Sequence, residues 1–550
     1  MADDTTSSVD PNSGFCSKTN TFHSLRPKAP LPSETTPLSI THYLFSHLQA
    51  SPPPPSTPAL IDPSTRRHVL YPEFTCLVKT LAAALESQLK LSYGHTAFVL
   101  SPNTLDLPIL FFSLISLGVT VSPSNPASTA PEISRQIHLS RPVIAFATSA
   151  TAHKLPTSLR YSAVLLDSPE FQSMMTSTTS TPAPELPPVC FPQSHTAAVL
   201  YSSGTTGAVK GVELTHRNWI SMLASAYAVR NPTAASPPPV MLCAVPFFHV
   251  YGFGVIMRVL GFGETLASIS GRFDLRATLR AVEENRISHV AWAPPVVVAV
   301  VKMGSEIDGY DLSSLQVVGS GGAPLAKSVI DKLKKHLPNV QVAQGFGLTE
   351  TTGRVFGTVG PNETRVVGAT GKLMSNFEAK IVDPDTGIAL PPMMTGELWV
   401  RGPFVMKGYL RDEKATAASI DAEGWFKTGD LCYIDNEGYL FYVDRIKELI
   451  KYKGYQVAPA ELEHLLQSHP DIADAAVVPY PDEEAGQVPM AFVVRRLGSV
   501  VDESQVMDFI TKQVASYKKI RRVSFINEVP KSAQGKLMRK ELIKLALSKL

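Results

Sequence analysis

Apolar residues recur along most of the chain in two patterns that alternate with each other. Thr96 to Leu100 and Ala163 to Leu166 are short apolar runs typical of buried strands, whereas Leu107 to Leu117 has the length and spacing of a helix. Strands that alternate with helices in this way favour parallel α/β sheets. The pattern therefore predicts the α/β class.

The pattern changes towards both ends of the chain. Residues 1–36 are rich in Ser, Thr, Asp and Pro, so we expect a mobile segment or one draped over the surface. Near the other end, Pro459 opens an amphipathic helix and Asp474 to Val478 forms a new strand. We expect a large domain of packed α/β subdomains over residues 37–445 and a small α+β lid domain over residues 446–547.

Composition narrows the range of functions. At 550 residues, with 44% hydrophobic and 18% charged residues, the chain can bury more than one core. The net charge of +2 is too small to indicate a nucleic-acid partner or a membrane surface. The five cysteines form no CxxC pair, which argues against a zinc site or a disulfide framework. No apolar run reaches the ~18 residues of a membrane span, and the N-terminus lacks the apolar core of a secretory signal.

One loop stands out for its chemistry. Tyr201 to Gly211, YSSGTTGAVKG, follows the apolar run Ala197 to Leu200 and offers glycine N–H groups, hydroxyls and one lysine. Such a loop suits phosphate, although an ordinary turn has the same composition, and its spacing is not that of a P-loop. Thr215 is placed to cap a following helix, so we expect the loop to lie between a strand and a helix.

Three further stretches carry polar groups beside apolar runs. Pro246 to Gly252 contains His249, which is either functional or a hydrogen-bonded core histidine. Val317 to Pro324 indicates a buried strand that enters a tight turn, and it only weakly resembles a dinucleotide fingerprint. Gln344 to Glu350 combines two glycines, a hydroxyl and a carboxylate, which suits a strand end that contacts one phosphate and one metal ion.

The region before the lid domain has its own candidate groups. Asp430 follows a tight turn and could bind both hydroxyls of a ribose, or it could be a simple Asp turn. Asp444 and Arg445 follow a second strand. Lys447 to Gly454 concentrates three lysines before a glycine, a pattern that also occurs on solvated helix faces and hairpins.

Taken together, six stretches resemble the successive signature motifs of the adenylate-forming acyl-CoA synthetase superfamily. They are YSSGTTGAVKG, PFFHVYG, QGFGLTE, FKTGD, DRIKELIKYKGYQVAPAELE and PKSAQGKLMRK. The order and rough spacing match over residues 190–540, and the apolar pattern before them fits the rest of the large domain. Within the superfamily, KYKGYQVAPAELE and YDLSSLQVVGSGGAPL are most similar to plant 4-coumarate:CoA ligases and their peroxisomal relatives.

The resemblance implies a ligase that joins a carboxylic acid to coenzyme A with ATP and Mg²⁺. The acid first attacks the α-phosphate of ATP, which gives acyl-AMP and pyrophosphate, and the CoA thiolate then displaces AMP. Catalysis in such a reaction is mostly positioning and charge neutralisation. The two steps use two orientations of the small domain.

The resemblance also assigns residues to the nucleotide. The β- and γ-phosphates would be held by Ser202, Ser203, Gly204, Thr205, Thr206 and Lys210. Gln344, Gly345 and Thr349 would contact the nucleotide, with Thr349 on the α-phosphate, and Glu350 would hold Mg²⁺. Asp430 and Arg445 would bind the ribose, and Lys536 would bridge the substrate carboxylate and the α-phosphate.

Other positions match the acyl and CoA sites of the family. His249 would gate the acyl pocket, and Lys447 would be the hinge between the domains. The acyl-adenylate pocket would be lined by Tyr251, Gly322, Gly345, Gly353, Arg354, Lys447, Lys451 and Gln456. CoA would be bound by Arg272, Lys453 and Gly454, where the glycine leaves room for the thiol.

Gly353 and Arg354 stand where hydroxycinnamate-using relatives carry a proline and a valine. A buried unpaired guanidinium is costly, so Arg354 must either meet an acceptor in the pocket or turn outward to solvent. This departure argues against coumarate itself as the preferred substrate, while cinnamate- and coumarate-type acids stay among the candidates. The acyl substrate is therefore left between cinnamate-type phenylpropanoids and fatty or jasmonate-precursor acids.

The last three residues, Ser548-Lys549-Leu550, form the tripeptide that the peroxisomal import receptor reads, so we expect a peroxisomal enzyme. Two alternatives share these motifs. A luciferase-like adenylating oxygenase would have the same signature stretches and C-terminus, and a non-catalytic nucleotide-binding protein would retain the fold. A dehydrogenase rests only on Gly319 to Ala323.

Overall fold

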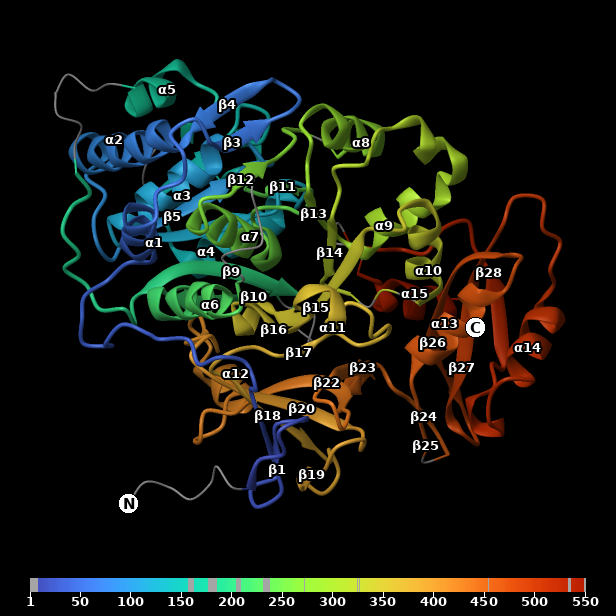
Figure 1. The fold of residues 1–550 in the computed structure, drawn as a ribbon. Helices are drawn as coiled ribbons and strands as arrows, with labels where there is room; N and C mark the ends of the chain where they lie inside the picture. Colours follow the sequence, from blue (N-terminus) through green and yellow to red (C-terminus); the bar gives the residue numbers. More distant parts are fainter. Residues whose placement is uncertain are drawn as a thin grey trace.

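The computed structural model of the chain describes residues 8–156, 163–176, 185–203, 209–230, 238–271, 273–323, 325, 327–453, 455–532 and 536–548. A large N-terminal body and a small C-terminal domain, red in the picture, lie side by side (Figure 1). The predicted α/β class, with a large domain and a small lid domain, is confirmed. Several residues assigned above lie outside the described ranges: Gly204, Thr205, Thr206, Arg272, Gly454, Lys549 and Leu550.

The strands of the described residues form four sheets. One sheet of the large domain is largely parallel and carries the strands nearest the candidate site. Its order is β17 (Lys372–Leu373), β16 (Gly353–Gly357), β15 (Gln341–Leu348), β14 (Val317–Gly321), β13 (His289–Trp292), β11 (Val240–Cys243), β12 (Thr265–Ala267), β3 (Pro58–Asp62) and β4 (Arg67–Leu70). The predicted buried strand at Val317 and its tight turn are confirmed, because Gly322 follows β14 with φ +87°.

A second sheet of the large domain carries the glycine-rich loop. Its order is β21 (Gly408–Tyr409), β10 (Val209–Thr215), β9 (Thr196–Ser203), β6 (Thr120–Ser124), β5 (Thr96–Leu100), β7 (Ile144–Ala147) and β8 (Val164–Leu165). Because β9 and β10 pair antiparallel, the loop joins two strands, and its expected place between a strand and a helix is wrong. The predicted cap is confirmed: Thr215 Oγ1 accepts the N–H of Asn218, 3.1 Å away, at the start of α6 (His216–Ala228).

The third sheet is antiparallel and includes the N-terminal segment. Its strands are β1 (Phe15–Cys16), β2 (Thr21–His23), β18 (Glu378–Val382), β20 (Gly396–Arg401), β22 (Phe426–Ile434) and β23 (Leu440–Arg445), with β19 (Ala389–Leu390) beside β18. Phe22 is 1% exposed, and His23 Nδ1 lies 3.2 Å from Glu378 Oε1. Phe15–Cys16 and Thr21–His23 are therefore built into a sheet, and the expectation of a mobile or draped segment is wrong for these two strands.

The C-terminal domain has a sheet and cores of its own. The strand order is β25 (Tyr455–Val457), β24 (Ile450–Tyr452), β27 (Gly486–Arg495) and β26 (Ile472–Asp482), with β28 (Arg522–Phe525) parallel to β27. Leu462 and Leu466 of α13 (Pro459–Ser468) are buried on one face of this sheet, as their spacing predicted. The chain passes from the third sheet to this one immediately after Arg445, through the short helix η5 (Ile446–Glu448).

Helices cover the sheets of the large domain and both faces of the small one (Figure 1). The remaining helices are α1 (Ile40–Ala50), α2 (Tyr71–Leu89), α3 (Asp106–Ser116), α4 (Ala130–Ser140), α5 (Pro169–Thr176), α7 (Val250–Gly261), α8 (Leu275–Glu284), α9 (Pro294–Lys302), α10 (Lys327–His336), α11 (Gly360–Glu363), α12 (Glu413–Ser419), α14 (Glu503–Thr511) and α15 (Arg539–Leu547). No helix within the described ranges has the length and hydropathy to cross a membrane.

Candidate active site

The two strands that flank the glycine-rich loop converge on one carboxylate. Ser202, near the end of β9, donates to Glu350 Oε1 at 3.0 Å, and Tyr409 OH donates to the same oxygen at 3.0 Å. Lys210, paired with Ser202 across the hairpin, places Nζ 4.2 Å from the centre of the Tyr409 ring. A hydroxyl, an ammonium and a carboxylate thus lie together at one edge of the sheet.

These groups fit Mg²⁺ bound with a polyphosphate. Within the described part of the chain, Glu350 Oε2 accepts no hydrogen bond, so this oxygen is available to a cation. The same described residues contain no cluster of three or more His, Cys, Asp or Glu side chains that could hold a metal. Mg²⁺ usually binds through one or two carboxylates plus substrate phosphates, which matches a single available carboxylate here.

Strand β15 leads from two predicted nucleotide residues, Gln344 and Gly345, to this carboxylate at its end. Gln344 donates its backbone N–H to Thr358 Oγ1 at 3.0 Å and its side-chain amide to the Ala369 carbonyl at 3.3 Å. Gly345 follows it, and Thr349 begins the short helix η4 (Thr349–Thr351) in a buried position. Glu350 is the next residue, so the motif sets a hydroxyl and a carboxylate side by side where the strand ends.

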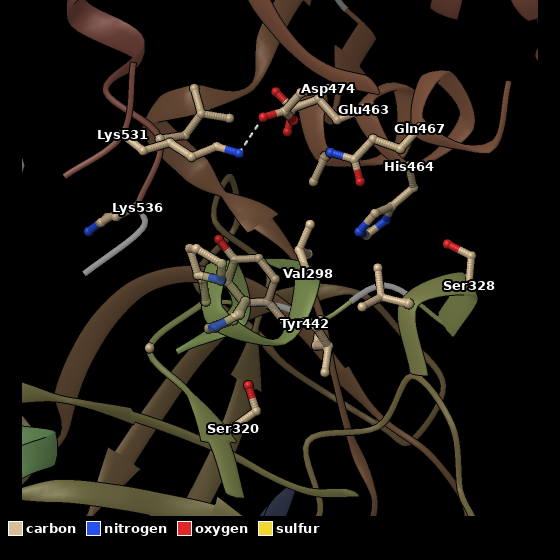
Figure 2. Close-up of a pocket in the computed structure, with 18 of the residues that line it drawn as sticks. Val298, Ser320, Ser328, Tyr442, Glu463, His464, Gln467, Asp474, Lys531 and Lys536 are labelled. Atoms are coloured by element: carbon tan, nitrogen blue, oxygen red, sulfur yellow. Dashed lines mark hydrogen bonds and ion pairs between the residues drawn. The ribbon is translucent and has the colours of Figure 1, made fainter. Parts of the chain in front are cut away.

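A cavity of about 1050 Å³ opens between the two domains. It is lined by Gln344 and Gly345, by Asp430 and Arg445, and by Lys536 from the C-terminal domain. Figure 2 shows Lys536 near one wall, apart from Lys531, which pairs with Asp474 at 2.5 Å. The cavity thus collects predicted nucleotide residues from segments nearly two hundred positions apart.

Asp430 and Arg445 face each other across β22 and β23, with Arg445 Nε 3.3 Å from Asp430 Oδ1. Burial raises the pKa of Asp430 to about 6, against the opposing effect of Arg445. Burial, together with the charge of Arg445, lowers the pKa of Lys536 to about 8. The pair and the lysine therefore form a buried, mixed-charge wall that favours an incoming anion.

His249 and Tyr251 lie at the start of α7. His249 is the N-cap residue, and its Nδ1 accepts the backbone N–H of Tyr251 at 3.2 Å. Burial, with a contribution from the charge of Lys536, lowers the pKa of His249 to about 4, so its ring is neutral at pH 7. Tyr251 OH donates to the Gly319 carbonyl at 3.1 Å. The pocket residues Gly322 and Gly353 both have positive φ, +87° and +99°.

Four of the predicted residues lie in the link between the domains or in the first hairpin of the small domain. Lys447 lies in η5 at the boundary, where burial and the nearby Arg445 lower its pKa. Lys451 and Gln456 are exposed cross-strand neighbours of β24 and β25, and Lys453 is exposed at the turn between these strands. The hairpin lies at the end of the small domain remote from β14 and β15 (Figure 1). The structure therefore does not bring Lys451, Lys453 or Gln456 to Lys536.

Sequence reasoning did not find Tyr409 or the arginine network of the small domain. Tyr409 lies in a two-residue strand that reaches Glu350 only through its pairing with β10. Arg539 donates to Glu448 at 2.7 Å and also bonds Glu463, which ties η5 to α13. Arg539 is the last but one residue of the motif PKSAQGKLMRK, three residues after Lys536, and its place in this motif is the sequence signal that could have found it.

A large α/β domain, a small C-terminal domain in contact with it, and a cavity between them that gathers carboxylate, lysine and arginine side chains define an adenylate-forming enzyme fold. Residues 48–410 match the AMP-binding enzyme family, and residues 461–536 match the AMP-binding enzyme C-terminal domain. The chain belongs to the AMP-binding enzyme family.

Similarity to individual proteins narrows the type of enzyme within this family. The chain is 50% identical over 556 residues to 4-coumarate–CoA ligase-like 6 of Oryza sativa subsp. japonica, covering 98% of this chain and 92% of that protein. It is 42% identical over 550 residues to peroxisomal OPC-8:0-CoA ligase 1 of Arabidopsis thaliana, covering 98% and 99%. O-succinylbenzoate CoA synthetase (MenE) from Bacillus subtilis, solved with its acyl-adenylate intermediate, has a TM-score of 0.78 at 26% identity, covering 91% of this chain and 97% of that one.

The chain is accordingly an ATP-dependent acyl-CoA ligase of the 4-coumarate–CoA ligase-like type, an AMP-forming acid–thiol ligase. Enzymes of this kind use ATP, Mg²⁺ and CoA.

Proposed function

We propose that this ligase activates a phenylpropanoid acid of the cinnamate or coumarate type, or a fatty or jasmonate-precursor acid, inside peroxisomes. The observation that supports the activation of an acid is the position of Lys536, a residue of the small domain, in one cavity with Asp430 and Arg445 of the large domain. A carboxylate and the α-phosphate of ATP repel each other, and a buried cation at their meeting point offsets that repulsion.

In the first step a carboxylate oxygen of the acid attacks the α-phosphorus, and pyrophosphate leaves. Lys536 donates to both reacting anions, and Thr349 orients the α-phosphate. Asp430 and Arg445 hold the ribose hydroxyls, while Gln344 and Gly345 contact the nucleotide. Glu350 would hold Mg²⁺, which supplies neutralising charge to the phosphates.

The loop after β9 completes the phosphate site. Its assigned residues are Ser202, Ser203, Gly204, Thr205, Thr206 and Lys210. Lys210 supplies the cation and the others supply hydroxyl and backbone N–H donors. His249, neutral at pH 7, closes the acyl pocket without adding a charge next to Lys536.

In the second step the CoA thiolate attacks the acyl carbon and AMP leaves. A rotation of the small domain about Lys447 would replace Lys536 with the β24–β25 hairpin, which carries Lys451, Lys453, Gly454 and Gln456. Arg272 would meet the CoA phosphates. Lys536 would then serve the adenylation step, and the hairpin residues would serve the CoA-transfer step.

The test measures both half-reactions with a panel of acids. ATP–pyrophosphate exchange reports acyl-AMP formation, and CoA-ester formation reports the whole reaction. Cinnamate, coumarate, benzoate, medium-chain fatty acids and a cyclopentanone-octanoate acid separate the substrate classes. Exchange with none of them would contradict the proposal, and light emission with luciferin and oxygen would favour an oxygenase instead.

Peroxisomal import would depend on Ser548-Lys549-Leu550. Ser548 is exposed at the end of α15, and one relative, 42% identical, is named as a peroxisomal ligase. A fluorescent protein fused to the N-terminus should co-localise with a peroxisomal marker, whereas the same fusion with Leu550→Asp should not. Diffuse fluorescence from the unaltered fusion would contradict peroxisomal localisation.

A further inference from the structure

Arg354 of β16 lies against the sheet instead of turning outward. A Cβ placed on Gly345 would lie 2.9 Å from Arg354 Cδ, and a Cβ placed on Gly357 would lie 2.5 Å from Cδ and 2.8 Å from Nε. The side chain therefore occupies the space that two glycines leave open on the face of β15 and β16. Of the two sequence expectations for this residue, the outward-turned, solvated one is wrong.

The guanidinium has no acceptor in the described part of the chain. It makes no side-chain hydrogen bond there and no ion pair within the same ranges. The two neighbouring arginines are already paired: Arg26 lies 2.7 Å from Glu363, and Arg258 lies 3.4 Å from Glu264. Burial, with the charges of Arg258 and Arg26, lowers the pKa of Arg354 to about 10, so it remains charged at neutral pH.

A row of glycines forms the floor of this space. Gly321, Gly345 and Gly357 are direct neighbours across β14, β15 and β16, so their missing side chains leave one face of the sheet open. Tyr251 covers the β14 end of the row: a Cβ on Gly321 would lie 4.0 Å from its ring, and its hydroxyl already donates to the Gly319 carbonyl. Arg354 covers the β16 end, and its guanidinium N–H groups bond none of the described residues.

The row also connects Arg354 to the nucleotide cavity. Gly345 lies under Arg354 and lines the cavity that contains Lys536 and Asp430. Gly345 thus belongs both to the cavity lining and to the surface under Arg354, and an acid bound in the cavity would reach Arg354 by extending past Gly345. The Arg354 side chain is partly exposed, so its N–H groups are accessible to an acceptor oxygen of such an acid, and a charge-assisted hydrogen bond there would stabilise the complex.

We propose that Arg354 binds an acceptor oxygen, a ketone carbonyl or a second carboxylate, at the end of the acyl chain remote from the reacting carboxylate. The substrate class is thus oxo acids or dicarboxylic acids in preference to plain fatty acids. This inference rests on the proposed acyl-activating function of the same site. Arg354 determines specificity through direct contact with the substrate.

The experiment compares acids matched in chain length: decanoate, its terminal methyl-ketone analogue and decanedioate. The wild-type kcat/KM is read first, from ATP–pyrophosphate exchange, and we expect the ketone or the diacid to exceed decanoate by about tenfold or more. Comparing the methyl-ketone acid with decanedioate shows whether the enzyme prefers a carbonyl or a second carboxylate. A wild-type enzyme that uses decanoate as well as both of them would overturn the inference, whether or not any variant folds.

The variant Arg354→Met removes the cation and keeps the chain length. The preference should fall by about tenfold or more, while thermal stability is maintained because no protein partner in the described ranges loses a bond. Arg365→Met, at an exposed arginine after α11, is the matched control and should keep the wild-type preference. An unchanged ratio in Arg354→Met would also overturn the inference. Absence of exchange with these three acids and with the whole panel proposed above would instead count against the proposed function.

Discussion

The charge on Lys536 depends on the groups around it. Burial and Arg445 lower its pKa to about 8, while Glu448 and Asp430 act in the opposite direction. The ammonium is mostly protonated at pH 7 and lies among partners that only partly compensate it. Incoming phosphate and carboxylate groups would complete its surroundings, which is what a cation of the adenylation step requires.

Lys536→Ala should lower the rate of acyl-AMP formation by roughly 10²–10³ and leave CoA-ester formation from supplied acyl-AMP largely intact. The reason is that only the first step brings the carboxylate and the α-phosphate together. Lys531→Ala is the control, because Lys531 lines the same cavity but pairs with Asp474 at 2.5 Å. Single-turnover assays of each half-reaction make the measurement, and equal losses in both would contradict the role.

The pH dependence of adenylation should follow the same residue. An amine is charged below its pKa, so kcat/KM for pyrophosphate exchange should be high at neutral pH and fall as pH rises through about 8, the pKa of Lys536 in the free enzyme. Lys536→Arg keeps its charge to much higher pH, so the alkaline fall should move upward in this variant. The same alkaline limb in wild type and Lys536→Arg would assign the titration to another group.

At the scale of elements, one glycine allows the turn that holds His249 and Tyr251 at the start of α7. A Cβ on Gly252 would collide with the Pro246 carbonyl oxygen and lie 2.7 Å from its carbon, whereas on Gly254 of the same helix the nearest atom, in Trp219, is 3.9 Å away. Gly252→Ala should therefore lower the free energy of unfolding by roughly 1–3 kcal/mol and weaken adenylation. Gly254→Ala should be neutral or stabilising by up to about 1 kcal/mol. Denaturant unfolding of both variants compares them, and similar curves would refute the role of Gly252.

The sequence predicted those helices and strands that a short stretch of residues is enough to define. The strand at Thr96 and the cap at Thr215 follow from apolar runs and from one hydroxyl before a helix, and both are confirmed. The hairpin of β9 and β10 was missed because Val212 and Leu214 give only a brief alternation between a glycine and a helix cap. Strand β2 was missed because Ala379, which pairs with Phe22 and ties the strand to the sheet, lies more than three hundred residues later in the chain.

In the candidate site, too, the sequence predicted individual residues but not the contacts between distant segments. Motifs supplied Ser202 and Glu350 without indicating that the two touch, since a contact across 148 positions depends on how the sheets pack. Tyr409 joins them from a strand too short to have a pattern of its own. The position of Arg354 over Gly345 likewise depends on the register of β15 and β16, which a lone arginine does not reveal.

At the scale of the whole molecule, the two domains present only one of the predicted catalytic surfaces to the cavity. Lys536 lines the cavity, and Asp444 of the large domain accepts the N–H of Ala460 at the start of α13 at 2.8 Å, across the boundary. The β24–β25 hairpin lies away from the cavity (Figure 1). This arrangement suits the adenylation step proposed above, and the proposed CoA transfer through the hairpin would require the small domain to move.

The separation of the two surfaces gives a prediction for Gly454, which lies outside the described residues and follows Lys453 at the exposed turn after β24. Gly454→Trp should still release pyrophosphate at a near wild-type rate, because the neighbouring hairpin residues do not line the cavity in the adenylation arrangement. CoA-ester formation should fall by about 10²-fold or more, since a bulky ring at the thiol's path displaces the nucleophile from the acyl carbon.

The control is Val500→Trp, at a position of the same domain that is 91% exposed and outside the cavity lining, which should leave both steps unchanged. Normal CoA turnover by Gly454→Trp would place the thiol path elsewhere, and an equal loss of pyrophosphate release would indicate that one domain arrangement serves both half-reactions.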